Sequence, residues 1–344
     1  MTMLKKIWSH TVCKILVFVG VISIFNYFLI GWHYKSQVKS EQTEYGVSFS
    51  TKYAEELGLD WQDAFTALTE DLVFKKLRLM SYWDLHEPEN EQYDFIDLDW
   101  QIEQAEEQGI EVVLALGARQ PRYPECHIPG WADGLEDQAF DDQLIEYIET
   151  VVNRYKDSPA IEAWQVENEP RNVVFSTCRP YFDRDRLSRE LAAVKAIDSS
   201  RPSYMNLSVE HQLPLQGPIG DRVGYSIYER VNATVLGKNI AWEHRIPTSW
   251  HSFRSGLIGL FWNRQTYVHE LQAEPWGPQA TVALSQEEQA KSMNPRFLLE
   301  NIDYAEKTGA NLVYLWGGEW WYWQKTVNND SAMWEVVDQL IINE

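Results

Sequence analysis

The sequence predicts an α/β protein built as a (β/α)8 TIM barrel and preceded by one N-terminal transmembrane helix. After residue 44, short β-rich runs alternate with amphipathic stretches at helical spacing, which is typical of parallel strands joined by crossover helices. Eight such runs occur in about 300 residues, and eight is the strand number of this barrel. An open doubly wound sheet is the alternative, but no Gly-rich phosphate loop follows the first run.

The expected strands are short runs rich in valine, isoleucine, leucine and tyrosine, each followed by a change to helical periodicity. Residues 229–265 hold no regular pattern, and we expect them to form a long insertion after the sixth strand. In chain order the expected strands are Tyr45–Phe49, Leu77–Tyr82, Glu111–Leu116, Ile161–Val166, Ser203–Leu207, Val223–Ile227, Tyr267–Ala273 and Asn311–Trp316.

Several expected helices are bounded by residues that favour helix ends. Asp60 is a suitable N-cap, because its carboxylate accepts from free amide groups of the first turn. Pro295 suits a first helical position, and Gly109 and Gly309 suit C-terminal stops. Apolar residues recur at helical spacing in residues 61–72, 98–105, 144–152, 187–194, 297–305 and 333–340.

The N-terminal segment from Ile15 to Trp32 is apolar, and its length suits a membrane span, which needs roughly 20 residues. Lys5 and Lys6 precede it and favour a cytoplasmic N-terminus. A cleaved signal peptide is the alternative, but no small-x-small cleavage site follows. We therefore expect a short cytoplasmic N-terminus at 1–14, a signal anchor at 15–32, a tether at 33–44 and the barrel, on the extracytoplasmic side, at 45–344.

The composition excludes some partners and favours one. A formal net charge of −21 argues against binding nucleic acid and against docking on anionic lipid. The chain has 16 tryptophans, several of them in polar, loop-like stretches, where a flat ring can stack on the apolar face of a sugar. Packing in a core or an interface is the alternative for most of them. The eight histidines are scattered, so neither a metal nor another cofactor is expected.

The three cysteines, Cys13, Cys126 and Cys178, lack the spacing of a metal site. Cys126 and Cys178 fall in the loops after the third and fourth expected strands, which are neighbours at the barrel mouth. Either both are unremarkable thiols, or they form a disulfide if the domain faces an oxidising compartment.

Two glutamates close expected strands that face each other across the barrel mouth. Glu169 follows the fourth strand in Asn168-Glu169-Pro170, and Glu274 follows the seventh in Glu274-Pro275-Trp276. The C-terminal strand ends carry the chemistry of such barrels. Cleavage of a glycosidic bond needs a proton donor and a second carboxylate, about 5–5.5 Å apart when the anomeric configuration is retained. For any single glutamate, a structural salt bridge is the alternative.

At these residues the sequence resembles the clan A glycoside hydrolases, the retaining group that includes the family-five cellulases and mannanases. The clan's Asn-Glu pair is matched by Asn168 and Glu169, and its nucleophile by Glu274. Its strand-two arginine, strand-six tyrosine and strand-eight tryptophan are matched by Arg78, Tyr228 and Trp316.

The sequence departs from family five at two positions. The histidine usual two residues before the strand-six tyrosine is replaced by Ser226. The histidine associated with strand three is also missing, since the chain offers Gly117 and Arg119 there. The clan resemblance is unaffected, but the family and the sugar stay open.

The resemblance implies a role for each matched residue. Glu169 would protonate the leaving oxygen, and Glu274 would attack the anomeric carbon of a β-linked poly- or oligosaccharide by double displacement. Arg78 and Tyr228 would hold the oxygens of Glu274. The remaining expected substrate contacts are Asn168 at the 2-hydroxyl, Trp316 as the floor of the −1 subsite, and Trp276 and Trp83 at the mouth.

Four other acids are expected to stay outside the chemistry. Glu167 should point to the opposite face of its strand from Asn168. Glu270, four residues before Glu274, should lie near the barrel bottom as a structural partner. Glu87 and Glu319 lie on mouth loops, where either could bind a substrate hydroxyl, and we expect both to be solvated loop charges. A catalytically inactive barrel that binds glycans through its tryptophans is the rival to the enzyme as a whole.

Overall fold

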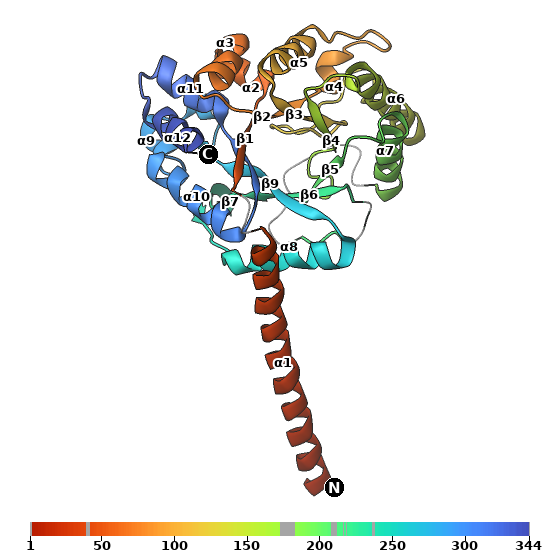
Figure 1. Cartoon of the computed structure of the whole chain (residues 1–344), viewed down its shortest axis with the longest axis vertical. Coiled ribbons are helices and arrows are strands. Elements are labelled where there is room, and N and C mark those ends of the chain that lie inside the picture. The colour runs from red at the N-terminus through yellow and green to blue at the C-terminus, as the bar shows by residue number, and fades with distance from the viewer. Residues whose placement is uncertain are drawn as a thin grey trace.

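The computed structural model describes residues 2–38, 42–172, 183–207, 212–215, 217, 219–235 and 238–343. Within these residues, eight parallel strands close into a barrel in the order β1-β10-β9-β6-β5-β4-β3-β2, and helices surround it (Figure 1). The predicted (β/α)8 barrel is therefore confirmed. Its strands are β1 Glu44–Ser48, β2 Lys76–Met80, β3 Glu111–Leu116, β4 Ile161–Val166, β5 Ser203–Leu207, β6 Arg222–Ile227, β9 Gln265–Gln272 and β10 Leu312–Trp316.

The sequence shows an apolar stripe on each outer helix. These stripes pack against the outward faces of the strands and form one large core. Asp60 caps α3 as predicted, accepting from the amides of Gln62 and Asp63. Gly109 and Gly309 end α5 and α10 in the left-handed conformation that glycine adopts without strain. The helices are α2 Thr51–Glu56, α3 Trp61–Thr66, α4 Trp83–His86, α5 Ile96–Gln108, α6 Asp137–Tyr155, α7 Arg184–Ile197, α9 Gln286–Ala290, α10 Pro295–Thr308, α11 Gly318–Val327 and α12 Ala332–Ile342, with short turns η1 Ala67–Asp71 and η2 Thr281–Ala283.

The insertion after β6 is more regular than the sequence suggested. It contains an antiparallel pair, β7 (Arg230–Val235) and β8 (Lys238–Glu243), and a helix, α8 (Thr248–Trp262). Periodicity missed α8 because its sequence is rich in glycine, serine and aromatic residues, and because one of its neighbours is the N-terminal helix rather than the barrel alone.

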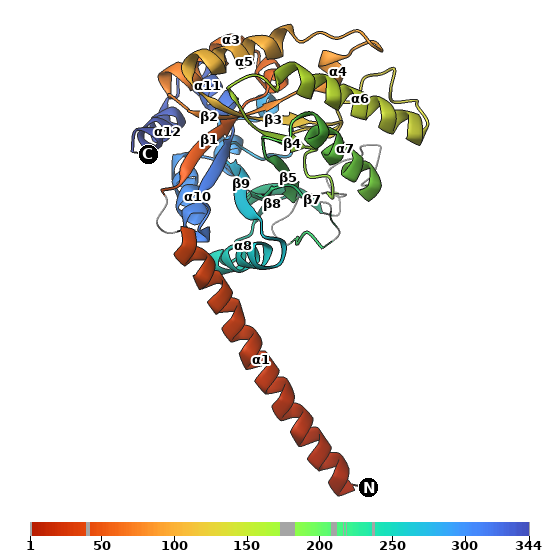
Figure 2. The same ribbon diagram turned by 45° about the vertical axis from the view of Figure 1, so that its right-hand side comes forward.

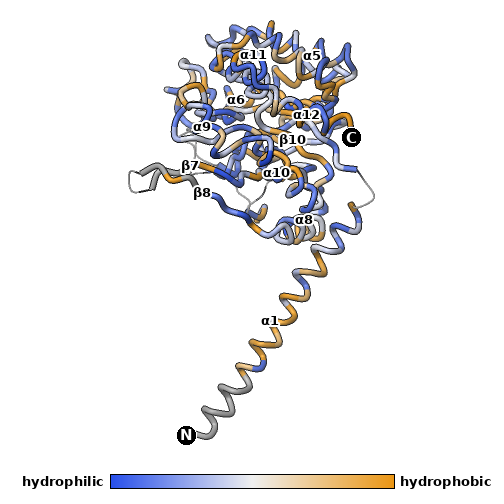
Figure 3. Tube along the Cα trace, turned by 90° about the vertical axis from the view of Figure 1, so that its left-hand side faces the viewer, coloured by the Kyte–Doolittle hydropathy of each residue, from blue (hydrophilic) through white to orange (hydrophobic). Residues whose placement is uncertain are grey.

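The N-terminal helix α1 (Thr2–Val38) projects from the barrel as a single rod of about 55 Å (Figures 1 and 2). Its middle is predominantly apolar (Figure 3). The part from Val12 to Val38 is long and apolar enough to cross a membrane, a test that a signal sequence also passes. The helix runs on through residues 33–38, which were expected to begin a polar tether.

The end of α1 is helical because it packs on the barrel. The Tyr34 hydroxyl donates to the carbonyl of Gly309 at 3.0 Å and lies 3.3 Å from the Thr266 hydroxyl. Thr266 lies near the start of β9, and Gly309 precedes β10, so α1 meets the barrel at the N-terminal ends of the strands. This is the opposite end from the predicted carboxylates.

Gly46 in β1 tests the packing inside the barrel. A Cβ at Gly46 would lie 2.5 Å from the Tyr314 ring and 2.9 Å from the backbone oxygen of Lys76. We expect Gly46→Ala to lower the free energy of unfolding by about 1–3 kcal/mol, the usual cost of overpacking. Chemical denaturation of the detergent-solubilised full chain measures it. Gly130→Ala, whose Cβ meets nothing within 4 Å, is the control and should be neutral. Equal stability of both variants would contradict the expectation.

Candidate active site

One irregularity in β9 decides which side chains reach the centre of the barrel. Tyr225 and Ser226 are adjacent in β6, but their partners in β9 are Val268 and Glu270, so β9 holds one extra residue there. The pairing of β9 with β10 shifts over the same stretch. This is a β-bulge, a feature that re-aims side chains and is frequent beside active sites. As a result, His269 and Glu270 both turn towards the carboxylate that follows β4.

Three buried groups meet at this point. Ligand-type atoms of Glu169, His269 and Glu270 all lie within 4.8 Å of one another. Glu169 comes from the end of β4 and has a φ of 45°, a left-handed conformation that is uncommon for a residue other than glycine. Strain of this kind persists where the surroundings impose it, often at functional sites.

Glu270 is held by two donors that the sequence had assigned elsewhere. The fully buried Arg78 of β2 donates from Nη1 to Glu270 Oε1 at 2.9 Å. The Tyr228 hydroxyl donates to Glu270 Oε2 at 2.8 Å. Arg78 also donates from Nη2 to Asn168 Oδ1 at 2.7 Å and from Nε to Gln165 at 2.7 Å. One guanidinium therefore fixes both Glu270 and Asn168.

Glu169 has weaker partners. Its Oε2 accepts from the amide of Asn172 at 2.9 Å, and its Oε1 accepts from the Ser226 hydroxyl at 3.1 Å. The His269 Nε2 atom lies 3.4 Å from the same Oε1. Burial, together with the negative charge of Glu270, raises the pKa of Glu169 to about 8. Glu169 is therefore largely protonated at neutral pH.

The pKa values of the two neighbours of Glu169, Glu270 and His269, are lowered instead. Burial opposes the ionisation of Glu270, but the charge of Arg78 and the hydrogen bonds from Arg78 and Tyr228 hold its pKa below the ordinary value. Burial lowers the pKa of His269 to about 3, so that the imidazole is neutral at physiological pH. Two carboxylates whose pKa values are pushed apart are suited to different roles, one as an acid and the other as a base or nucleophile.

The structure contradicts the contacts expected for Glu274. Arg78 and Tyr228, which were predicted to hold it, bind Glu270 instead. Glu274 pairs with Arg122, whose Nη2 donates to Glu319 at 3.0 Å. The position predicted for Glu270, near the barrel bottom, is also wrong. Arg78 and Tyr228 contact Glu270, which lies inside β9, and not Glu274, which lies beyond its end.

Arg122 also changes the environment of Trp316. Its guanidinium lies 4.0 Å from the centre of the Trp316 ring and 3.7 Å from that of Tyr53. A cation over an aromatic face is favourable, all the more where water is excluded. Trp316 lies next to Tyr228, and its role as the floor of the −1 subsite stays a prediction. Arg122 covers one face of the Trp316 ring, so the expected stacking on a sugar requires the opposite face.

Three further expectations were wrong because the side chains are buried. Trp83 is fully buried, stacks on Tyr147 with centroids 5.7 Å apart, and donates to Glu87 at 2.7 Å, so it does not line the mouth. Glu87 is accordingly not a solvated charge. Glu319 is also fully buried and accepts from the backbone amide of Ser50 at 2.5 Å.

Trp276 stays a candidate for substrate contact. It is half-buried and meets the ring of Tyr228 edge-on, with centroids 5.1 Å apart. Glu167 turns away from Glu169 and accepts from the backbone amides of Ala118 and Arg119 at 3.1 and 2.7 Å. It therefore braces the loop after β3 against the end of β4, in agreement with its predicted separate orientation.

The structure describes only one of the two cysteines that were predicted to pair. Cys126 is disulfide-bonded, and Cys13 is a free, exposed thiol. Cys178 lies outside the described residues. The Cys126–Cys178 pair therefore stays a prediction.

The cluster of Glu169, His269 and Glu270 also has the donor types of a cation site. Arg78 already neutralises Glu270 at 2.9 Å, and the pKa of Glu169, about 8, leaves that group mostly uncharged at neutral pH. Both effects weaken the attraction for a divalent ion. The arrangement is better suited to proton transfer and nucleophilic attack.

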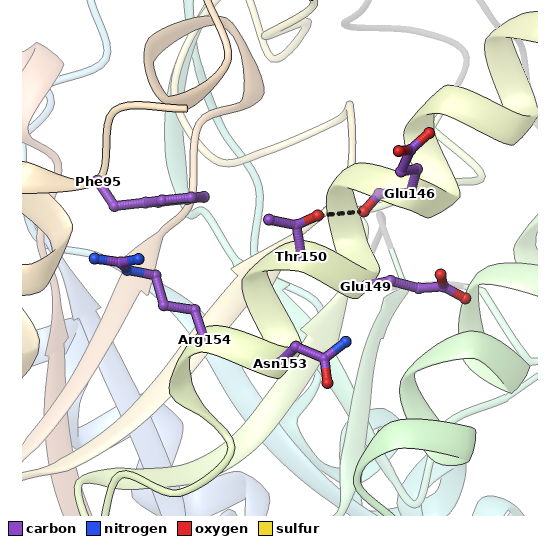
Figure 4. Close-up of a pocket in the computed structure, with 6 residues that line it drawn as sticks. All are labelled: Phe95, Glu146, Glu149, Thr150, Asn153 and Arg154. Atoms are coloured by element: carbon purple, nitrogen blue, oxygen red, sulfur yellow. Dashed lines mark hydrogen bonds between the residues drawn. The ribbon is translucent and has the colours of Figure 1, made fainter. Parts of the chain in front are cut away.

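A separate hollow lies on the outside of the barrel and takes no part in this arrangement. It is lined by Phe95 and by four-residue-spaced side chains of α6, including Glu146, Thr150 and Arg154 (Figure 4). Thr150 bonds the Glu146 carbonyl of its own helix at 2.9 Å. The end of α6 leads into the start of β4, so this hollow lies away from the strand ends that carry the carboxylates.

The sequence pointed to Arg78, Asn168, Glu169 and Tyr228, and the structure brings these four together. It missed His269, Glu270 and Arg122, and it gave no role to the hydroxyl of Ser226. One signal was available for Glu270, because a charge inside a buried strand needs a partner of opposite charge. Arg78 is the matching charge inside β2.

Comparisons with known proteins find similarity to glycoside hydrolases. Residues 61–131 match the family described as beta-galactosidase, glycoside hydrolase family 42. A probable mannan endo-1,4-beta-mannosidase F of Neosartorya fischeri is 28% identical over 213 residues, covering 57% of this chain and 44% of that protein. The mannan endo-1,4-beta-mannosidase 1 of rice, Oryza sativa, is 25% identical over 207 residues, covering 52% and 47%. The predicted resemblance to clan A glycoside hydrolases is confirmed.

Solved structures share the fold. An endo-beta-1,4-xylanase of family 10 from Gloeophyllum trabeum aligns with a TM-score of 0.54 and 16% identity, over 80% of this chain and 83% of that one. An exo-beta-1,4-mannosidase from an Opitutaceae bacterium aligns with a TM-score of 0.53 and 15% identity, over 80% and 51%. At this identity the likeness concerns the fold alone. The chain spans less than half the length of the two curated mannosidases above.

The raised pKa of Glu169 has a consequence for stability. Between pH 4.5 and about 8 the folded chain keeps a proton that the unfolded chain releases, so this group destabilises the fold increasingly as pH rises. Glu169→Gln, which mimics the protonated form, should therefore raise the melting temperature more at pH 8.5 than at pH 5. Thermal unfolding at both pH values measures this, with the exposed Glu55→Gln as control. An equal effect at both pH values would contradict it.

Proposed function

We propose that the chain is a membrane-anchored glycoside hydrolase that cleaves β-linked glycans with retention, using Glu169 as acid/base and Glu270 as nucleophile. The observation that carries the proposal is the approach of the two carboxylates within 4.8 Å, with opposite pKa shifts. Retaining enzymes hold their carboxyl groups about 5–5.5 Å apart, whereas inverting enzymes need roughly 6.5–9.5 Å. Glu270 takes the role that the sequence had given to Glu274.

The two steps follow from the protonation states. Ionised Glu270 attacks the anomeric carbon and forms a glycosyl ester, while Glu169 gives its proton to the departing oxygen. Glu169, now ionised, then takes a proton from water, whose oxygen attacks the anomeric carbon and releases Glu270. Arg78 and Tyr228 keep Glu270 charged and oriented in the resting enzyme.

Asn168 is positioned for a supporting contact. Its Oδ1 atom accepts from Arg78 at 2.7 Å and from Asn206 at 3.1 Å, which fixes the orientation of the amide. The amide nitrogen is then the group that donates to the sugar 2-hydroxyl, a contact that strengthens in the transition state.

The first substrates to test are β-1,4-linked mannans. The sequence similarity to two mannan endo-1,4-beta-mannosidases supports this choice. The apolar helix α1 supports anchoring, with the barrel on the extracytoplasmic side.

Covalent trapping tests the assignment of the nucleophile. A 2-deoxy-2-fluoro glycosyl fluoride of mannose or glucose should form a stable ester on Glu270, identified by mass spectrometry of the digested peptide. Glu270→Gln should abolish labelling, and Glu274→Gln should retain it. A label on Glu274 in the wild-type chain would overturn the assignment, and turnover without any trapped ester would argue against the retaining mechanism.

The pH dependence of kcat/KM tests the acid. Activity requires Glu169 protonated and Glu270 ionised, so it should fall as pH rises through about 8 and as pH falls below the lowered pKa of Glu270. Ser226→Ala removes a hydrogen bond that favours ionised Glu169 and should move the alkaline limb to higher pH. An alkaline limb that stays in place in this variant would contradict the assignment of that limb to Glu169.

A further inference from the structure

The end of α1 is docked against α8 along one stripe. Tyr27, Ile30, Gly31 and Tyr34 are the less exposed residues of this part of the helix, at the spacing of one helical face. The Tyr27 hydroxyl lies 2.9 Å from the hydroxyl of Ser249 at the start of α8. The ring of Tyr27 lies 4.7 Å from that of Phe253, measured between centroids.

Two glycines let the helix backbones approach closely. A Cβ on Gly256 of α8 would lie 2.6 Å from the Ile30 side chain and 2.9 Å from the Ile30 carbonyl oxygen. A Cβ on Gly31 would lie 3.3 Å from the Phe253 amide nitrogen. Close crossings on small residues are the usual way in which helices pack at membrane depth. Figures 1 and 2 both show α8 lying across the end of α1.

The length of the apolar stretch determines how deep in a membrane the contact between α1 and α8 would lie. Residues 15–32 span about 27 Å as a helix, close to the roughly 30 Å of a bilayer core. Residues 15–26 alone would span only about 18 Å, and the preceding stretch carries His10 and Lys14. A membrane crossed by α1 must therefore reach the turn of Tyr27–Gly31, the turn that contacts α8.

The exposed surface of α8 is suited to the boundary between lipid and water. Leu260 and Phe261, at its end, are 66% and 69% exposed. The sequence has 51 acidic residues, yet none lies before Glu41 and none lies between Glu243 and Glu270. The two segments that would meet a bilayer therefore contribute no negative side chain to the overall charge of −21. A helix that exposes bulky apolar groups and carries no acid is suited to the headgroup and acyl boundary.

We propose that α8 lies in the interfacial layer of the membrane that α1 crosses, with Leu260 and Phe261 inserted among the lipids. This inference rests on the anchoring proposed above. The docked α1 and the inserted α8 then fix the barrel with the N-terminal strand ends towards the membrane. Glu169 and Glu270 open away from the lipid, so the accessible substrates are glycans of the surrounding space rather than headgroup sugars of the same membrane.

Site-directed fluorescence tests this arrangement. In a Cys13→Ser background, Phe261→Cys is labelled with the polarity-sensitive dye NBD, and the full chain is reconstituted in phosphatidylcholine nanodiscs. The matched control is Val327→Cys, which is 53% exposed at the end of α11, on the far side of the barrel from α1 (Figure 1). The background without an introduced cysteine is labelled in parallel, and any dye that it takes up is subtracted, because Cys126 and Cys178 remain in it.

We expect blue-shifted NBD emission at position 261, with strong quenching by lipids spin-labelled near the headgroup, and water-like emission with little quenching at 327. Alkaline carbonate extraction of native membranes is measured in parallel. Retention of the chain together with water-like emission at 261 would overturn the inference and leave the anchoring intact. Release of the chain by carbonate would overturn the anchoring and the inference with it.

Discussion

The buried guanidinium of Arg78 is the contact on which the rest of the site depends. It ties the interior of β2 to β4 through Gln165 and to β9 through Glu270, and it also orients Asn168. A buried charge without partners is strongly destabilising, so the strands must keep a register that delivers all of them. The same contacts that satisfy the arginine keep Glu270 ionised. Barrel stability and the ionised state of Glu270 therefore depend on one network.

The bulge in β9 makes this network compatible with catalysis. Regular alternation would send His269 and Glu270 to opposite faces of the strand. With one residue inserted, both groups lie near Glu169, and the Nε2 atom of neutral His269 lies 3.4 Å from Glu169 and 3.8 Å from Glu270. Burial and the charge of Glu270 then keep the proton on Glu169. The local backbone irregularity thus explains why two nearby glutamates differ in protonation.

The fold was predictable because hydrophobic periodicity marks strands and helices directly, and three of the predicted strands (those now named β3, β4 and β5) coincide with the observed ones. Arg78, Asn168, Glu169 and Tyr228 were predictable because they lie in or next to regular strands. The alternation of the sequence could not place Glu270 beside Glu169, since a one-residue bulge leaves no mark in it; the only signal for Glu270 was the need of buried Arg78 for a partner of opposite charge. Trp83 was misplaced because a tryptophan in a polar stretch can still turn inward, here onto Tyr147.

The distribution of charge and helix packing gives the barrel two different ends. Carboxylates and arginines concentrate at the C-terminal strand ends, where Glu169, Glu270, Glu274 and Glu319 are balanced by Arg78 and Arg122. The opposite end carries α8 and the docked end of α1. Because α1 continues as helix to Val38 and packs on the barrel, its orientation is set by side-chain contacts rather than by a flexible joint. With the anchoring proposed above, the candidate site would lie at a fixed distance from the lipid, and glycans would be selected by where they lie as well as by their linkage.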